Sequence, residues 1–227
     1  MGYIIVIEGT DGCGKQTQTE RLYNRLKDEG FNVRTQSFPN YESPSSSPVK
    51  MYLGGEFGES DMSLDAYQAS ILFTVDRLCT YSKDLKDFYE NDGIIIFDRY
   101  VQSNMLHQAG KIQNLQERDE YLEWLDKLEF DTLKLPRPNK MIFLDVAVDV
   151  SLALARAREG LKAQTKMDIH EKNSEHIQKA YESGKYVCKK YNWDSINCVE
   201  NGNMRTIDDI SDEIYNLVIA DIKAWRK

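Results

Sequence analysis

The fold of this chain is decided by the stretch Ile4-Ile5-Val6-Ile7-Glu8-Gly9-Thr10-Asp11-Gly12-Cys13-Gly14-Lys15-Gln16-Thr17-Gln18. Its four leading apolar residues predict a strand that is buried on both faces, as at the centre of a parallel sheet. A glycine-rich turn with the spacing Gly9-x-x-x-x-Gly14-Lys15 follows, and a helix is expected after it at 17–29. The glycines let successive backbone N–H groups converge on one point, and the helix dipole and Lys15 add positive charge there. Together these features predict a phosphate-binding loop, with Lys15 directed at the β- and γ-phosphates of a nucleotide.

Gln16 departs from the usual pattern of this motif. The motif places Ser or Thr after the lysine as a Mg²⁺ ligand, whereas this chain has Gln16 there and Thr17 next. A decayed loop without catalytic activity therefore remains an alternative. Cys13 also has two interpretations, because a thiol near a helix N-terminus can be acidified but a small residue also fits a tight turn.

Composition limits the possible classes of protein. The 227 residues suffice for one large α/β domain, and 41% of them are hydrophobic, as in a packed globule. The net charge of −8 argues against extended nucleic-acid or membrane partners, and no apolar run is long enough to span a bilayer. The four cysteines lack metal-ligand spacing and are expected to be reduced thiols of a cytoplasmic protein: Cys13, Cys79, Cys188 and Cys198.

Buried strands alternate with helices along the chain. Strands are expected at 4–7, 31–37, 94–97, 141–146 and 196–199. Helices are expected at 17–29, 63–89, 116–130, 150–158 and 168–191, and from 207 to near the end. Ser63 is expected to be the N-cap of the second helix, which has apolar residues at helical spacing: Leu64, Tyr67, Ile71, Val75 and Leu78. This alternation predicts an α/β fold of the P-loop NTPase type, with about five parallel strands and helices on both faces.

Ligands of such sheets bind beyond the carboxyl ends of the strands. The residues at these positions are the phosphate loop, Phe38-Pro39, Asp98-Arg99-Tyr100 and Asp145. Asp98 is a candidate Mg²⁺-organising carboxylate, and Arg99 suits a second phosphate through bidentate hydrogen bonds. A structural ion pair is the alternative for this Asp-Arg pair. Asp145 also ends a strand, but no cation adjoins it in the sequence. It serves only as supporting evidence for a site at this edge of the sheet.

The sequence resembles the thymidylate kinase family over essentially the whole chain. The segments that carry the resemblance are 8–15, Phe38-Pro39-Asn40-Tyr41, Phe73-Thr74-Val75-Asp76-Arg77 and Asp98-Arg99-Tyr100-Val101-Gln102-Ser103-Asn104. The resemblance implies phosphoryl transfer from MgATP to dTMP, which gives dTDP and ADP for dTTP synthesis. It also implies a single domain at 1–227 with a short lid at about 159–167, and a homodimer.

The resemblance assigns roles to individual residues. The ATP-binding residues would be Gly9, Thr10, Asp11, Gly12, Cys13, Gly14, Lys15, Gln16 and Thr17, and the metal would be held by Asp98 and Thr17. The acceptor nucleotide would contact Asp11, Phe38, Tyr41, Phe73, Arg77, Arg99, Tyr100, Asn104 and His107. Phe73 would stack on thymine, with core packing as the alternative. One helical turn on, Arg77 would donate to a base carbonyl. Lys15, Arg99, Asp11 and Arg158 would act in the transfer itself.

Three positions depart from the family pattern. Asn40 replaces a charged residue of the Phe-Pro loop, so one phosphate contact is expected to be missing. His107 stands where an aromatic residue often crowds the sugar 2′ position, which leaves the choice between deoxyribose and ribose open. Gly12 replaces a catalytic arginine that some members carry, so the cations are expected from the lid side: Arg156, Arg158, Lys162 and Lys166. Asp168 and Glu171 stand where the family carries acidic residues after the lid. The alternative is that they belong to a solvated helix face.

Other functions remain open at this point. A deoxynucleoside kinase would need a carboxylate base and would leave Arg99 without an acceptor phosphate. Another nucleoside-monophosphate kinase would differ only in its acceptor. A GTP-dependent switch or nucleotide sensor would typically carry Asn-Lys-x-Asp, and Asn139-Lys140-Met141-Ile142 lacks the aspartate.

Overall fold

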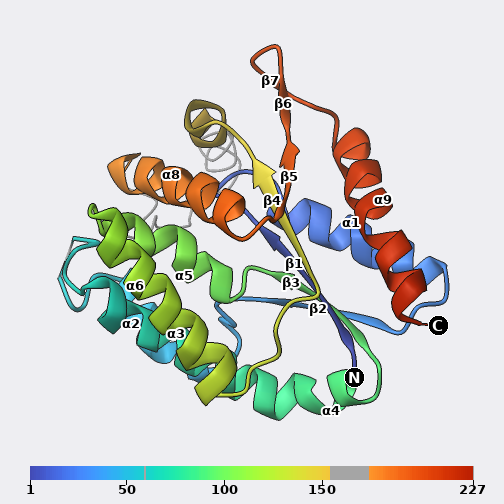
Figure 1. The fold of residues 1–227 in the computed structure, drawn as a ribbon, viewed down its shortest axis with the longest axis horizontal. Coiled ribbons are helices and arrows are strands. Elements are labelled where there is room, and N and C mark those ends of the chain that lie inside the picture. Colours follow the sequence, from blue (N-terminus) through green and yellow to red (C-terminus); the bar gives the residue numbers. More distant parts are fainter. Residues whose placement is uncertain (59, 154–173, 227) are drawn as a thin grey trace.

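The computed structural model describes residues 1–58, 60–153 and 174–226 and contains one central sheet (Figure 1). Five strands of the described residues form this sheet in the order β2-β3-β1-β4-β5. Every pairing within it is parallel. The strands are β1 (Tyr3–Glu8), β2 (Val33–Ser37), β3 (Ile94–Asp98), β4 (Lys140–Asp145) and β5 (Asp194–Asn197). The predicted α/β fold is thereby confirmed.

Helices cover both faces of the sheet. The α-helices of the described residues are α1 (Lys15–Asp28), α2 (Ser47–Leu53), α3 (Ala66–Thr80), α4 (Lys86–Glu90), α5 (Val101–His107), α6 (Leu115–Asp126), α8 (Ser174–Lys190) and α9 (Ile207–Trp225). Short 3₁₀ turns are η1 (Pro44–Ser46) and η3 (Ala109–Lys111), and π-helical turns are η2 (Tyr81–Leu85) and η4 (Lys127–Thr132). Residues 148–153 are also helical, and the rest of the helix expected at 150–158 lies outside the described residues.

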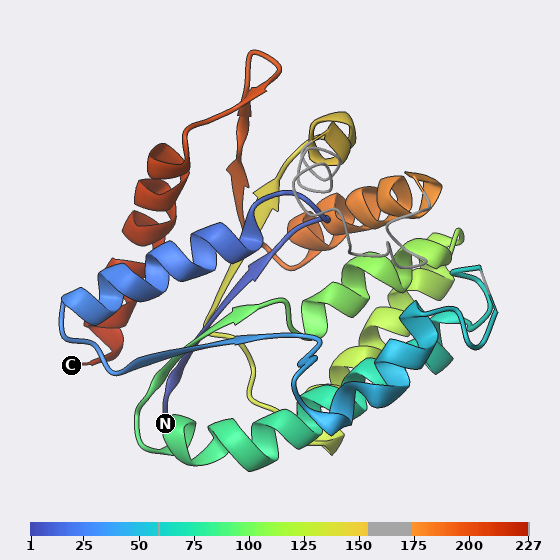
Figure 2. The ribbon, with the colours of Figure 1, turned by 180° about the vertical axis from the view of Figure 1, so that it is seen from behind.

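The alternation of side chains along β1 produces two hydrophobic cores. Ile5 and Ile7 pack on one face beneath α1 and α9, which lie side by side in Figure 2. Ile4 and Val6 pack on the other face, in one cluster with residues of α3, α5, α6 and α8. β1 is fully buried because it has a strand on each side and a helical layer on each face. The chain order reverses at β1, which places its loop at the switch point where ligands of such sheets bind.

The segment between β2 and α3, which is rich in Ser and Pro, contains the short helices η1 and α2. Ser43 caps η1 by accepting a hydrogen bond from the Ser45 N–H group, and α2 begins immediately afterwards. Pro44 and Pro48 stand in the first turns of these helices, where a proline needs no N–H partner. The Ser- and Pro-rich sequence is therefore a helix start in this chain, and α2 could not be distinguished from a loop by composition.

The second predicted helix is present, but its predicted N-cap is wrong. The N-cap of α3 is Asp65, which forms a capping box with Gln68, and not Ser63. Of the apolar residues with helical spacing, Leu64 and Leu78 pack against buried hydrophobic clusters, whereas Tyr67, Ile71 and Val75 are 39%, 41% and 39% exposed. The buried residues of α3 are small or polar: Ala66, Ala69, Ser70, Thr74, Asp76, Arg77 and Thr80. Hydrophobic spacing therefore located the helix but not the whole of its buried face.

The end of the chain also differs from the prediction at 196–199. Asn197 ends β5, and Val199 begins a separate antiparallel hairpin of β6 (Val199–Glu200) and β7 (Asn203–Met204). Thr206 then caps α9 by accepting a hydrogen bond from the Asp209 N–H group. Among the described helices, none has the length and apolar character required to cross a membrane.

Candidate active site

The phosphate loop joins β1 to α1 and has the predicted backbone geometry. Gly9, Gly12 and Gly14 have φ values of 152°, 83° and 96°, in the region that favours glycine. A Cβ atom on Gly9 would also lie 2.9 Å from the carbonyl oxygen of Leu144, so this position is closed to larger residues. The Lys15 ammonium is buried and donates to the carbonyl oxygens of Gly9 and Thr10 at 2.9 and 2.8 Å. The loop therefore holds its cation against its own backbone.

Cys13 contributes packing to this loop. Its thiol is buried, and burial raises the pKa above its ordinary value despite the nearby charges of Lys15 and Arg99. The thiol is thus protonated near neutral pH, which supports the interpretation of Cys13 as a small residue that fits the turn.

Two carboxylates with buried oxygen atoms, those of Glu8 and Asp98, flank the loop. Glu8 is fully buried at the end of β1, and its Oε1 atom accepts from the Tyr100 N–H group at 3.0 Å and the Ser103 hydroxyl at 2.8 Å. Burial raises its pKa. Among the described residues, Glu8 Oε2 and Asp98 Oδ1 have no hydrogen-bond partner. Sequence reasoning missed Glu8, although an acidic residue directly after an apolar strand was a usable signal.

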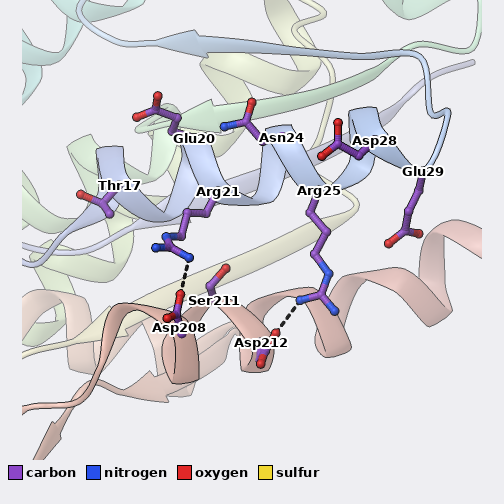
Figure 3. A pocket seen from close by; sticks show the side chains of 10 residues that line it. All are labelled: Thr17, Glu20, Arg21, Asn24, Arg25, Asp28, Glu29, Asp208, Ser211 and Asp212. Atoms are coloured by element: carbon purple, nitrogen blue, oxygen red, sulfur yellow. Dashed lines mark hydrogen bonds and ion pairs between the residues drawn. The ribbon is translucent and has the colours of Figure 1, made fainter.

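Thr17 and Gln16 point into different hollows. Gln16 lines the cavity that also contains Asp11. Figure 3 shows Thr17 at the start of α1, beside a surface groove between α1 and α9. Two ion pairs cross from α1 to α9 in that groove, with Arg21 bonded to Asp208 and Arg25 bonded to Asp212 at 2.5 Å. Thr17 thus lines the groove side of α1, and its predicted place as a metal ligand gains no support from this arrangement.

A cavity of about 370 Å³ lies at the carboxyl edge of the sheet. Its lining includes all the side chains expected to contact the acceptor nucleotide: Asp11, Phe38, Tyr41, Phe73, Arg77, Arg99, Tyr100, Asn104 and His107. Sequence reasoning missed Gln108, which also lines the cavity and whose buried Oε1 atom has no partner among the described residues. Side chains from segments far apart in the sequence therefore converge on one hollow next to the phosphate loop.

Arg99 is the cation that stands between the cavity and the phosphate loop. Its backbone has φ 68°, and its N–H group donates to the Ile7 carbonyl oxygen at 3.2 Å, which turns the chain sharply after β3. The guanidinium forms an ion pair with Asp11 of the phosphate loop. A fork of N–H donors held in this way is suited to a phosphate dianion.

Arg77 is oriented by a buried carboxylate that sequence reasoning missed. Its Nε and Nη2 atoms both donate to Glu129 in η4, the Nε–Oε2 distance being 3.2 Å. Thr74 donates to the same carboxylate at 2.5 Å. The Arg77 and Glu129 side chains are only 2% and 0% exposed. Nη1 lies 3.5 Å from the Tyr100 carbonyl oxygen, so with the other edge bound to Glu129 the second N–H of Nη1 is the donor available to a molecule in the cavity.

Phe73 and Asn104 line the cavity and also contact protein. The Phe73 ring meets Tyr52 edge to face with a centroid distance of 6.2 Å, so both stacking on a base and packing against protein remain open to it. Asn104 is buried, and its Nδ2 atom lies 3.5 Å from the Ser70 carbonyl oxygen.

Asp145 has a neighbouring cation in the folded chain, which α8 supplies. Its carboxylate accepts from the Tyr181 hydroxyl at 2.8 Å and forms an ion pair with Lys185, both on α8. Its carboxylate is therefore engaged by α8. The residues predicted for the lid side lie outside the described residues: Arg156, Arg158, Lys162, Lys166, Asp168 and Glu171.

Comparison with known proteins identifies similar chains. The family model described as thymidylate kinase matches residues 7–202. A probable thymidylate kinase of Methanosphaera stadtmanae is 31% identical over 222 residues, which cover 96% of this chain and 98% of that protein. The thymidylate kinase of Mycobacterium tuberculosis is 29% identical over 177 residues, or 78% and 81% of the two chains. A probable thymidylate kinase of Thermoplasma acidophilum is 27% identical over 221 residues, or 96% and 97%.

Proposed function

The chain belongs to the thymidylate kinase family, and from this premise we propose that it transfers the γ-phosphoryl group of ATP to dTMP, giving dTDP and ADP. The observation that carries the proposal is the acceptor cavity beside the phosphate loop. The ion pair between Arg99 and Asp11 connects the cavity to the loop. In this geometry the phosphate chain of ATP would lie in the loop at Lys15, and the acceptor phosphate would lie at Arg99.

The reaction needs no general base in this arrangement. The phosphate of a nucleoside monophosphate is already an anionic nucleophile, so positioning and charge neutralisation supply most of the catalysis. Arg99 would hold the acceptor phosphate, and Lys15 would neutralise charge on the transferring group. Asp11 holds the guanidinium of Arg99 in place through their ion pair.

The residues present fit a magnesium ion, which would neutralise charge on the β- and γ-oxygens of ATP. Asp98 would hold the ion, because its Oδ1 atom is buried near the phosphate loop without a partner among the described residues. The Oε2 atom of Glu8 is a second unpaired oxygen of this kind. Carboxylate oxygens are the ligands that Mg²⁺ prefers, and it keeps several waters besides.

Asp98→Asn is expected to raise the Mg²⁺ concentration needed for half-maximal activity by about tenfold or more, because an amide binds the ion less well than a carboxylate. Gln16→Ser, which restores the usual motif, is expected to preserve or lower this requirement. A Mg²⁺ titration of steady-state rates for both variants checks the prediction. It is wrong if the Asp98→Asn titration overlays that of the parent.

Two further features of the family are proposals for this chain. We infer a single domain at 1–227 in which the segment 159–167 acts as the lid, with Arg158 or a neighbouring cation at the ATP phosphates. We also infer a cytoplasmic location from the four cysteines, all of which are free thiols.

We infer a homodimer that forms through the exposed face of α3. Its Tyr67, Ile71 and Val75 follow one another at intervals of one helical turn, and each exposes more than a third of its surface. Ile71→Asp is expected to convert the dimer to a monomer in sedimentation velocity, because it places a charge in the apolar contact. Val75→Ala, a milder change on the same face, is the matched control. A parent that sediments as a monomer contradicts the proposal.

The function is tested with an acceptor screen in which MgATP is offered with each common nucleoside and nucleoside monophosphate. ADP formation that depends on dTMP is the expected result. ADP formation with thymidine instead would indicate a deoxynucleoside kinase, and phosphate release without any acceptor would indicate a switch. Either result overturns the proposed function.

A further inference from the structure

A row of buried polar side chains runs from Arg99 away from the acceptor cavity. His107, at the end of α5, lies with its Nε2 atom 3.3 Å from Arg99 Nη1. Its Nδ1 atom lies 3.1 Å from Nε2 of His176 on α8. The Nδ1 atom of His176 lies 2.9 Å from Oδ2 of Asp61, in the loop before α3. His107, His176 and Asp61 are 7%, 2% and 7% exposed, so three separate segments meet in the interior.

The chemistry of these atoms fixes a direction for the row. The guanidinium of Arg99 can only donate, and the carboxylate of Asp61 can only accept. A neutral imidazole has one donor nitrogen and one acceptor nitrogen. Arg99 therefore donates to His107 Nε2, His107 Nδ1–H donates to His176 Nε2, and His176 Nδ1–H donates to Asp61. With both rings neutral and protonated on Nδ1, each of these contacts in the row has a donor and an acceptor.

The directions in which the pKa values of His107 and His176 are shifted are consistent with neutral rings. Burial lowers the pKa of His107 well below its ordinary value, opposed by Asp11 of the phosphate loop and reinforced by Arg99, His176 and Lys15. Burial also lowers the pKa of His176, opposed by Asp61 and Asp11 and reinforced by Lys111 of η3. A protonated ring in the row would direct an N–H group at another donor.

We propose that His107, His176 and Asp61 form a positioning chain, defined by these three residues, that sets the plane of the Arg99 guanidinium for the acceptor phosphate. Asp11 binds Nη2 of Arg99 and His107 contacts Nη1, so the guanidinium is held at both of its terminal nitrogens. A bidentate contact with phosphate depends on the orientation of that plane. The inference rests on the proposed function, because it assumes that Arg99 holds the acceptor.

The positioning chain also gives His107 a role apart from the sugar. The sequence placed His107 at the 2′ position, and its ring does line the acceptor cavity. Its two nitrogens, however, are directed at Arg99 and His176. The effect of His107 on the acceptor is therefore expected to act through the phosphate contact and to be similar for deoxyribose and ribose acceptors.

The first test is imidazole ¹⁵N NMR of the full chain labelled at histidine, at pH 7 and without nucleotides. The chain has three histidines, so a His170→Gln sample identifies the third signal set. The expected result is that His107 and His176 are both neutral and carry the proton on Nδ1. A proton on Nε2 of either ring, or a charged ring at pH 7, overturns the proposal. This readout does not depend on catalysis, so it holds whether or not dTMP is the acceptor.

The second test compares the Michaelis constants for dTMP and ATP in matched variants. His176→Phe keeps a ring but removes both hydrogen bonds, and it is expected to raise KM for dTMP by about three- to tenfold while KM for ATP changes less than twofold. His107→Gln keeps an acceptor for Arg99 and a donor for His176, so it is expected to retain more of the dTMP affinity than His107→Phe. Equal changes in both Michaelis constants, or no advantage of Gln over Phe, overturn the proposal.

Acidification provides the third readout. The pKa values of both rings lie below the ordinary 6.5, so the folded chain binds fewer protons than the unfolded chain once the pH falls below 6.5. The free energy of unfolding is therefore expected to fall as the pH is lowered from 6.5, and KM for dTMP is expected to rise in parallel. His176→Phe should weaken both dependences. Dependences on pH that are identical in this variant and in the parent contradict the proposal. If the parent phosphorylates no nucleotide, the dissociation constant of dTMP by calorimetry replaces KM.

Discussion

Lys15→Ala is expected to lower the turnover rate by two or more orders of magnitude, which corresponds to a loss of about 3 kcal/mol of transition-state stabilisation. The expectation comes from where the ammonium lies. It is buried in the phosphate loop and is held by the carbonyl oxygens of Gly9 and Thr10, so its position is set before a nucleotide arrives. A charge that needs no reorganisation stabilises the transferring phosphoryl group more than a mobile charge at the surface.

The design of this measurement has to separate catalysis from folding. Lys15→Met fills the same volume without the charge, so it controls for loss of packing in the buried loop. Lys15→Arg retains the charge but replaces a compact ammonium by a planar fork, and it is also expected to be slow. Single-turnover rates at saturating ATP and dTMP, together with the melting temperature of each variant, check the prediction. A Lys15→Ala enzyme that melts like the parent and turns over at a near-normal rate contradicts the assigned role.

The parts of the molecule that local chemistry determines were predicted well. The run Ile4–Ile7 identified a strand buried on both faces, and it became the central strand of the sheet. The phosphate loop was identified because its glycines, its lysine and the helix after it are consecutive in the sequence. Phe38, Arg99 and Tyr100 were found because they follow strands, whereas the other residues expected around the acceptor came from the family resemblance, and all of them line one cavity. Their roles in binding remain predictions.

The parts that depend on contacts between distant segments were missed. Glu129 lies 52 residues from Arg77, and nothing in the sequence around it distinguishes it from the other carboxylates of the helix that leads into η4. The contact between His107 and His176 joins residues 69 apart. Helical spacing showed that Tyr67, Ile71 and Val75 share one face of α3, but spacing does not report whether a face is buried, and these three side chains are exposed.

Arg77→Ala is expected to have the largest effect on stability, about 3–5 kcal/mol, because it leaves the carboxylate of Glu129 buried without its cation. Arg77 and Glu129 are 2% and 0% exposed, so solvent does not replace the lost ion pair. The same change is expected to lower the preference for dTMP over dCMP. Thymine offers a carbonyl at C4 to the Nη1 edge of Arg77, whereas cytosine presents an amino group there. The mismatch would leave a buried donor without an acceptor, a difference of about 2 kcal/mol, or about thirtyfold in specificity.

A paired substitution separates the two effects. In Arg77→Met with Glu129→Leu the buried charges are removed together, and replacing such a pair by apolar side chains is often neutral or stabilising. Thr74 loses its bond to Glu129 in this variant, but its single hydroxyl hydrogen can then be donated to the Ser70 carbonyl oxygen, 2.9 Å away. The paired variant is therefore expected to melt near the parent and yet to lack the preference for dTMP. The specificity constants for dTMP, dUMP, dCMP, dGMP and UMP in the parent, Arg77→Ala and the paired variant make the comparison. If dCMP or a purine nucleotide is the best substrate of the parent, or if the paired variant keeps the full preference for dTMP, Arg77 does not read the base, even though the kinase activity itself would stand.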